Sequence, residues 1–229
     1  MGNGLHKADY CIYEEDFLDM AVIDSTLEEL SAAWRWTANG IGADIPNRAS
    51  FKDEAFGVLR ISTGSADNSY VTGQMPTEWI VPATGKRMIF KTRLNMTSAT
   101  QSELMVGVMD TAATDLFGGI QDGFYFRKDD GDANIDFVYE SGATAVSTTG
   151  IAVIAADTEI TLAFEWLSTG SGEGMLTVYV DGSPVTGLNG IPVISGAPSS
   201  LMGLGIGIKA GEAVQSHVDL DYLGVVVER

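Results

Sequence analysis

Apolar side chains alternate with polar or glycine positions over most of the last ninety residues of the chain, and no helical period appears there. Residues two apart in a β-strand point to the same face, so each alternating run predicts a strand with one buried face. The clearest runs are Ile160, Leu162, Phe164 and Trp166, then Leu176, Val178 and Val180, then Leu204, Ile206 and Ile208. Repeated strands joined by short turns predict a sandwich or a barrel.

Turn signals separate these strands along most of the chain. Phe124 and Phe126 lead into a polar turn that returns through Ile135 and Phe137, which predicts a hairpin over residues 123–140. A second hairpin is expected around Asp181 and Gly182, because Asp-Gly is a strong two-residue turn. The resulting roughly dozen strands are too many for one flat sheet, so we expect two packed sheets.

The N-terminal region differs from the rest of the chain. Ser25 and Glu28 fit a capping box, and LEELSAAW consists of good helix formers, so one short helix is expected near the N-terminus. Residues 1–13 are interpreted as an N-terminal arm for assembly, and residues 14–229 as a single sandwich domain. The apolar members of the arm are its expected partner contacts: Leu5, Tyr10, Ile12 and Tyr13.

Charge and composition narrow the classes of partner. The chain has 31 acidic and 13 basic residues and a formal net charge of -18, which disfavours nucleic acid and anionic membranes as partners. No apolar run is long enough to span a membrane. Cys11, the one cysteine, excludes an internal disulfide framework. The sequence MGNGLHKADY lacks the features of a secretory signal, so synthesis in the cytosol is expected.

Several segments occur in the order found in a known group of proteins. They are EEDFLD, RMIFKTRLNM, ELMVGVMDT, DGFYFRKDDGD, LTVYVDG and VDLDYLGVVVER. In this order they resemble the concanavalin-like, laminin-G-like jelly-roll sandwiches of tailed-bacteriophage virion proteins. The resemblance implies an all-β fold with two antiparallel sheets. It also implies a non-enzymatic virion structural role, as a capsid decoration, cement or head-fibre protein on the capsid exterior, synthesised in the host cytoplasm.

Partners and alternatives follow from this interpretation. The expected partners are the major capsid protein and further copies of the chain, as a homotrimer or as lattice neighbours; no cofactor is expected. The alternative function is a carbohydrate-binding module that stacks glycans on exposed Trp36, Trp79 or tyrosines. A third hypothesis is a divergent glycoside hydrolase, because Glu14, Asp16 and Asp19 come near the Glu-x-Asp-x-x-Glu pattern. The final Asp and the strand geometry argue against it.

Two clusters of residues contain side chains of the types that bind metal ions. Asp130, Asp132 and Asn134 have the first spacings of a calcium loop, but Ile135 and Ser141 replace its glycine and its bidentate glutamate. A simple hairpin turn explains the same residues. His217, Asp219 and Asp221 share one strand face opposite Val218, Leu220 and Tyr222, and we interpret them as the solvated side of a terminal strand.

Two further patterns suggest contacts between proteins. Arg87, Lys91 and Arg93 point one way along a strand and predict a basic ridge that meets an acidic partner. Gly203, Gly205 and Gly207 leave one strand face bare, which lets another group approach closely. Either the segment 20–36, with Trp34 and Trp36, covers that face within the monomer, or a neighbouring subunit does.

Overall fold

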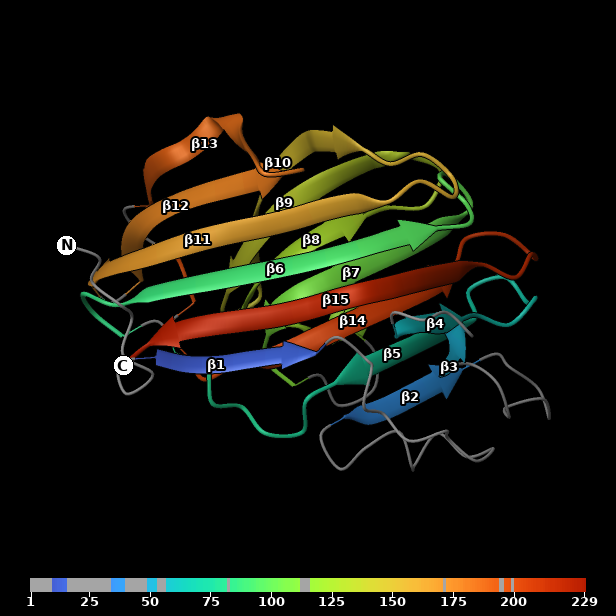
Figure 1. Cartoon of the computed structure of the whole chain (residues 1–229), viewed down its shortest axis with the longest axis horizontal. Helices are drawn as coiled ribbons and strands as arrows, with labels where there is room; N and C mark the ends of the chain where they lie inside the picture. The colour runs from blue at the N-terminus through green and yellow to red at the C-terminus, as the bar shows by residue number, and fades with distance from the viewer. Residues whose placement is uncertain are drawn as a thin grey trace.

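Two antiparallel sheets stack face to face with the core between them (Figure 1). The structure, a computed structural model, describes residues 10–15, 34–39, 49–52, 57–81, 83–111, 116–170, 172–193, 196–198 and 200–229. Within these ranges the chain is built almost entirely from strands, and both sheets pair their strands antiparallel. The predicted two-sheet, all-β architecture is therefore confirmed.

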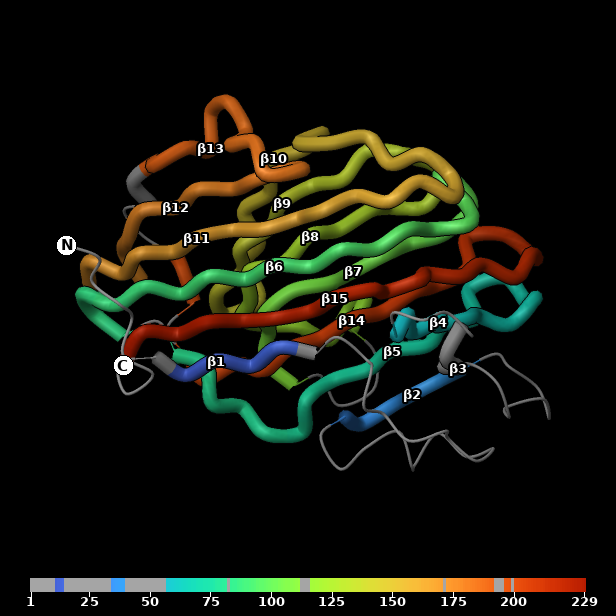
Figure 2. The backbone as a smooth tube through the Cα atoms, viewed as in Figure 1, coloured from blue at the N-terminus to red at the C-terminus, as the bar shows by residue number. Residues whose placement is uncertain are grey.

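The first sheet has eight strands. Its order is β13 (Ser183–Val193), β12 (Glu173–Val180), β11 (Ile160–Gly170), β6 (Arg87–Met96), β15 (His217–Glu228), β4 (Val58–Ser62) and β3 (Ala49–Lys52), with β1 (Tyr10–Glu15) also paired to β15. Figure 2 shows β15, the last strand of the chain, running through the middle of this sheet beside β6.

The second sheet has seven strands. Its order is β10 (Thr144–Val153), β9 (Asn134–Ser141), β8 (Gly123–Lys128), β7 (Ser102–Met109), β14 (Gly203–Ala210), β5 (Tyr70–Gln74) and β2 (Arg35–Asn39). The one helix among the described residues is α1 (Leu116–Gly119), a single turn between β7 and β8. No described helix has the length and apolar character needed to span a membrane.

Both predicted hairpins are present. Strands β8 and β9 pair from Gly123 opposite Glu140 to Arg127 opposite Asp136. Strands β12 and β13 meet at Asp181 and Gly182, whose φ angles of 49° and 76° are those of the left-handed region that an Asp-Gly hairpin turn requires. These elements were predictable because strand, turn and return strand are adjacent in sequence.

The alternating apolar residues meet between the sheets, as their spacing predicts. Phe164 of β11 is fully buried, and its ring centroid lies 5.3 Å from that of Phe90, 5.5 Å from that of Phe137 and 5.7 Å from that of Phe124. Stacked and edge-on aromatic pairs at these distances add to the free energy gained from burial. The aromatic cluster therefore joins both sheets through strands that lie far apart in sequence.

A β-bulge in β15 changes the orientation predicted for Tyr222. The pairing of β15 with β6 shifts by one residue between Leu220 and Tyr222. A bulge adds one residue to one strand, so the side chains after it point to the opposite face from the one the alternation predicts. Tyr222 is half-buried on the outer face, while Leu223 points into the core. The sequence prediction that Tyr222 lies opposite Asp219 and Asp221 was wrong.

Only part of the N-terminal region, for which a helix and an arm were predicted, lies within the described residues. The short helix expected over LEELSAAW lies almost wholly outside the described residues, as do residues 1–9 of the expected arm. Tyr10 to Glu15 form strand β1, which runs antiparallel to the C-terminal half of β15, from Tyr10 opposite Glu228 to Glu15 opposite Leu223. This part of the chain is therefore a strand of the sandwich.

Candidate ligand-binding site

The outer face of the seven-stranded sheet is closed by the segment that carries α1. A second apolar cluster lies there, separate from the core between the sheets, with Phe117 packed against it; its members are Met105, Met109, Leu116, Ile120, Tyr125 and Val138. All six are at most 7% exposed. This part of the face is filled by the chain itself, so it offers no open groove.

The same segment covers the bare glycine face of β14. A β-carbon added to Gly205 would lie 2.7 Å from the sulfur of Met109, and one added to Gly207 would lie 3.2 Å from the ring of Phe117. The face is thus covered within the monomer, by Met109 of β7 at Gly205, by Thr72 of β5 and Phe117 of α1 at Gly207, and by Met75 at Gly203. Trp36 packs instead over Gly73. Trp34 and Trp36 are not among the nearest neighbours of these glycines, and the rest of the segment expected to cover them, residues 20–33, lies outside the described residues.

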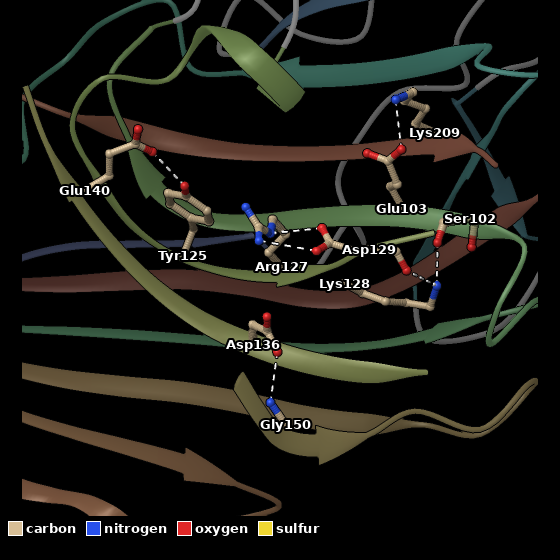
Figure 3. Close-up of polar contacts among 10 residues, drawn as sticks. All are labelled: Ser102, Glu103, Tyr125, Arg127, Lys128, Asp129, Asp136, Glu140, Gly150 and Lys209. Atoms are coloured by element: carbon tan, nitrogen blue, oxygen red, sulfur yellow. Dashed lines mark hydrogen bonds and ion pairs between the residues drawn. The ribbon is translucent and has the colours of Figure 1, made fainter. Parts of the chain in front are cut away.

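The polar side chains beside this cluster satisfy one another (Figure 3). Tyr125 Oη donates to Glu140 at 2.7 Å, and burial, followed by the effect of Glu140, raises the pKa of Tyr125. Lys209 Nζ donates to Glu103 at 2.8 Å, and Arg127 forms an ion pair with Asp129 at 3.0 Å. Groups already paired in this way gain little from binding a polar ligand.

Lys128 anchors the acidic turn that resembles a calcium loop. Its side chain is fully buried, and Nζ donates to the carbonyl oxygens of Ser102 and Asp129. Burial lowers the pKa of Lys128, and Asp130 and Asp132 oppose that shift. Asp132 Oδ1 accepts hydrogen bonds from the backbone and the side chain of Asn134, as in an ordinary polar turn. Within the described ranges no group of three or more His, Cys, Asp or Glu side chains could hold a metal ion.

A cleft lies on the outer face of the eight-stranded sheet. Its volume is about 580 Å³, and it is lined by Ile89, Lys91, Thr161, Ala163, Phe164, Glu165, Tyr179, Asp181 and Gly182. Lys91 of β6, Ala163 of β11 and Tyr179 of β12 lie directly opposite one another across the three strands. Because adjacent strands are about 4.8 Å apart, the small side chain of Ala163 leaves a gap of roughly 10 Å between the two longer ones.

The two carboxylates in this cleft have partners within the chain, whereas the ammonium group of Lys91 has no carboxylate partner among the described residues. Glu165 is held by Arg87 at 3.0 Å, and Asp181 Oδ1 accepts a hydrogen bond from the backbone of Thr161 at 2.8 Å. Lys91 has no carboxylate partner among the described residues; its ammonium lies 5.8 Å from the centre of the Tyr222 ring. The cleft therefore combines an accessible aromatic side chain, an ammonium donor and carboxylate acceptors, which are the groups that orient a polar ligand.

Four of the seven residues expected to contact a partner lie on the same face of the sandwich. Ile12, Arg87, Lys91 and Arg93 all lie on the outer face of the eight-stranded sheet. Tyr13 points inward, where its hydroxyl accepts a hydrogen bond from Trp34. The side chains of Leu5 and Tyr10 lie outside the described residues.

The basic ridge is largely neutralised within the monomer. Arg87 pairs with Glu165, and Arg93 pairs with Asp221 across β6 and β15. Alternation along one strand could not predict these acids, because they lie on neighbouring strands that are distant in sequence. Lys91 alone of the three lacks such a pair among the residues that the structure describes.

The acidic row at the start of β15 is less solvated than the sequence predicts. Asp219 is only 5% exposed, and both of its carboxylate oxygens accept hydrogen bonds from Arg60, at 2.6 and 2.7 Å. His217 Nδ1 lies 2.9 Å from the hydroxyl of Ser62. The row therefore belongs to contacts between β15 and β4, and the prediction of a solvated face was wrong for Asp219.

The tryptophans expected to stack glycans serve mainly the fold. Trp36 stacks against Trp34, with ring centroids 6.1 Å apart, and both Trp36 and Trp79 are half-buried against the core. Of the two aromatic residues that line the cleft, Phe164 is fully buried and Tyr179 is half-buried, so Tyr179 is the one that a ligand can reach. Of the three acids considered for hydrolysis, Glu14 is exposed on β1, whereas Asp16 and Asp19 lie outside the described residues.

Comparisons with known proteins identify the fold. No protein-family model and no curated protein sequence matches this chain. An endo-1,3-beta-glucanase from Streptomyces sioyaensis has a TM-score of 0.65 at 12% identity, covering 99% of each chain. The metal-free carbohydrate recognition domain of Emp46p has a TM-score of 0.59 at 10% identity, covering 92% of this chain and 94% of that one.

Peanut lectin gives a similar match, with a TM-score of 0.59 at 8% identity over 96% of this chain and 98% of that one. At such low identities the common property is the fold. The chain is a concanavalin-like jelly-roll sandwich, which confirms the fold implied by its sequence resemblance. The phage virion role that the same resemblance implies stays a prediction.

Proposed function

We propose that this chain is a non-catalytic carbohydrate-binding protein whose ligand lies in the cleft on the outer face of the eight-stranded sheet. The observation that carries the proposal is the cross-strand row of Lys91, Ala163 and Tyr179. This row places the ammonium group of Lys91 and the ring of Tyr179 on either side of a gap, and the small side chain of Ala163 lies at the bottom of that gap. The fold shared with a carbohydrate recognition domain supports the class of ligand.

Each group in the cleft suits one part of a sugar ring. The face of Tyr179 can pack against the apolar C–H face of the sugar, as aromatic rings combine apolar contact with a polar end. Lys91 can donate hydrogen bonds to hydroxyl or carboxylate oxygens, and Asp181 and Glu165 can accept them from hydroxyls through the carboxylate lone pairs that Thr161 and Arg87 leave unused. A shallow cleft with a few such groups favours recognition of exposed sugars along a glycan.

Removing the aromatic side chain should weaken glycan binding most. A glycan array followed by calorimetric titration of the best ligand should show at least a tenfold loss of affinity for Tyr179→Ala, which corresponds to about 1.4 kcal/mol. Tyr179→Phe keeps the ring and should retain most of the affinity. Lys91→Ala should also lower the affinity, whereas the control Lys209→Ala, on the opposite sheet, should leave it unchanged. Equal binding by Tyr179→Ala and the wild type would place the ligand elsewhere.

The absence of catalysis is part of the same proposal. Glu165 is engaged by Arg87, and Glu14 lies on β1, separated from β11 by β15 and β6. The wild-type protein should therefore release no reducing ends from a glycan that it binds. Release that is lost in Glu165→Gln or Glu14→Gln would instead identify a glycoside hydrolase.

Capsid attachment is the second candidate function. The observation that favours it is an exposed apolar row in which Ile12 lies opposite Val226 and Val226 lies opposite Ile89, with Ile12 51% and Ile89 37% exposed. Large apolar side chains gathered on an outer sheet face are typical of a contact with another protein. Cosedimentation with capsids lacking this protein, lost in Ile89→Asp, would support it. Unchanged cosedimentation of that variant, or none by the wild type, would oppose it.

A further inference from the structure

The edge strand β10 differs from the edge strands β2, β3 and β13, and from β1, which ends in the charged Glu14 and Glu15, in having no protection against pairing. Strand β10 forms the edge of the seven-stranded sheet (Figure 1), and residues 142–150 are all exposed. The opposite edge, β2, is a five-residue strand with an exposed Arg35. In the other sheet, β13 carries Pro184, Pro192 and two register shifts, and β3 has only four residues. Short strands, prolines, bulges and charges are the usual means of blocking an edge.

Strand β10 has none of these devices over its first half. The sequence from Ser141 to Ala156 contains no charged residue, although the chain carries a net charge of -18. Its pairing with β9 is regular from Thr144 to Thr148 and shifts only afterwards, where Gly150 has a φ of 66° and donates to Asp136 at 2.8 Å. The regular segment is rich in β-branched residues, which favour extended backbone.

The hairpin turn determines which backbone groups of β10 face outward. Gly142 and Ala143 have φ angles of 56° and 59°, so Ser141 and Thr144 flank a two-residue turn and form a hydrogen-bonded pair. The pattern alternates along the ladder, so the N–H and C=O groups of Val146 point toward β9. The N–H and C=O groups of Ala145 and Ser147 therefore point away from the sheet, where the described residues provide no partner.

We propose that β10 pairs antiparallel with β10 of a second copy of this chain, around a two-fold axis at Val146. In this arrangement Ala145 exchanges main-chain hydrogen bonds with Ser147 of the partner subunit, and the two Val146 side chains face each other. A two-fold axis makes the edge complementary to itself. An uncharged segment also brings two acidic chains together without placing like charges directly opposite each other across the new ladder. Val146, 43% exposed in the single chain, becomes buried.

Cross-linking tests both the contact and its register. In a Cys11→Ser background, Val146→Cys should form a covalent dimer under mild oxidation, because directly opposed residues in an antiparallel pair lie within disulfide range. Val214→Cys, at an exposed position outside the sheets, is the matched control and should remain monomeric on a non-reducing gel. The wild type should elute with twice the chain mass of 24.3 kDa by light scattering.

Val146→Lys should return the protein to a monomer that melts at the temperature of the wild type diluted until it too is monomeric, which separates loss of contact from loss of folding. The proposal would be overturned by a wild type that is monomeric at all concentrations together with a Val146→Cys variant that forms no cross-link. The edge would then be open to an extended segment of another protein. A dimer that persists in Val146→Lys would overturn the proposal as well. Neither outcome depends on whether the cleft binds a glycan.

Discussion

Phe164→Ala is expected to lower the free energy of unfolding by about 3–5 kcal/mol, as deletion of a large buried aromatic side chain does. Phe164 is fully buried and contacts rings from both sheets: Phe90 of β6 on its own sheet, and Phe124, Phe126 and Phe137 of β8 and β9 on the other. These neighbours are anchored on different strands, so they cannot close together around the cavity. The loss is a large part of the roughly 5–15 kcal/mol that stabilises a typical domain.

Urea unfolding followed by fluorescence measures this loss. The control is Val214→Ala, at a position that is 51% exposed, where a change within about 0.5 kcal/mol is expected. A loss below about 1 kcal/mol for Phe164→Ala would mean that the two sheets are not held together by this aromatic cluster. The result bears on the cleft too, because Ala163 and Glu165 are the immediate neighbours of Phe164 on β11.

Gly107→Ala is expected to be the most damaging of the small substitutions on the other sheet. A β-carbon at Gly107 would lie 2.4 Å from the carbonyl oxygen of Phe124 and 2.6 Å from the Cα of Tyr125, both of which belong to the backbone of β8. Strand β7 could accept it only by moving away from β8. We expect a loss near the upper end of the roughly 1–3 kcal/mol typical of overpacking.

Gly205→Ala provides a matched comparison, because Gly205 lies directly opposite Gly107 in the pairing of β14 with β7. The nearest atom to its added β-carbon is the sulfur of Met109, at 2.7 Å. A methionine side chain can adopt another rotamer, so the loss should be below about 1 kcal/mol. Thermal and urea unfolding of the two variants should differ clearly. Equal losses would contradict the close approach of β7 and β8.

Local patterns predicted the strands well and the surfaces poorly. The alternation in β11 and the Asp181-Gly182 turn act within one strand or one hairpin, so the sequence alone was sufficient for them. The bulge that turns Tyr222 outward has no counterpart in the alternation of apolar residues. A prediction from period two therefore holds only until the first irregularity in the strand.

The cleft depends on strand order, which no local pattern contains. Lys91, Ala163 and Tyr179 meet because β6, β11 and β12 are neighbours in the sheet. The same order brings Glu165 to Arg87 and Asp221 to Arg93, which removes two thirds of the predicted basic ridge. The sequence does show a small residue, Ala163, at an outward-facing position of a strand. This position predicts a cleft only when the residues on the two neighbouring strands are known.

We expect a glycan to bind to the outer face of the eight-stranded sheet, and nuclear magnetic resonance can map where a bound oligosaccharide lies. The best ligand from the array would be titrated into isotope-labelled protein, and the shifts of the backbone amides followed. We predict that the shifted amides cluster around Lys91, Ala163, Tyr179 and Asp181. Shifts confined to the seven-stranded sheet, or no saturable shift with any glycan, would show that the cleft is not a glycan-binding site.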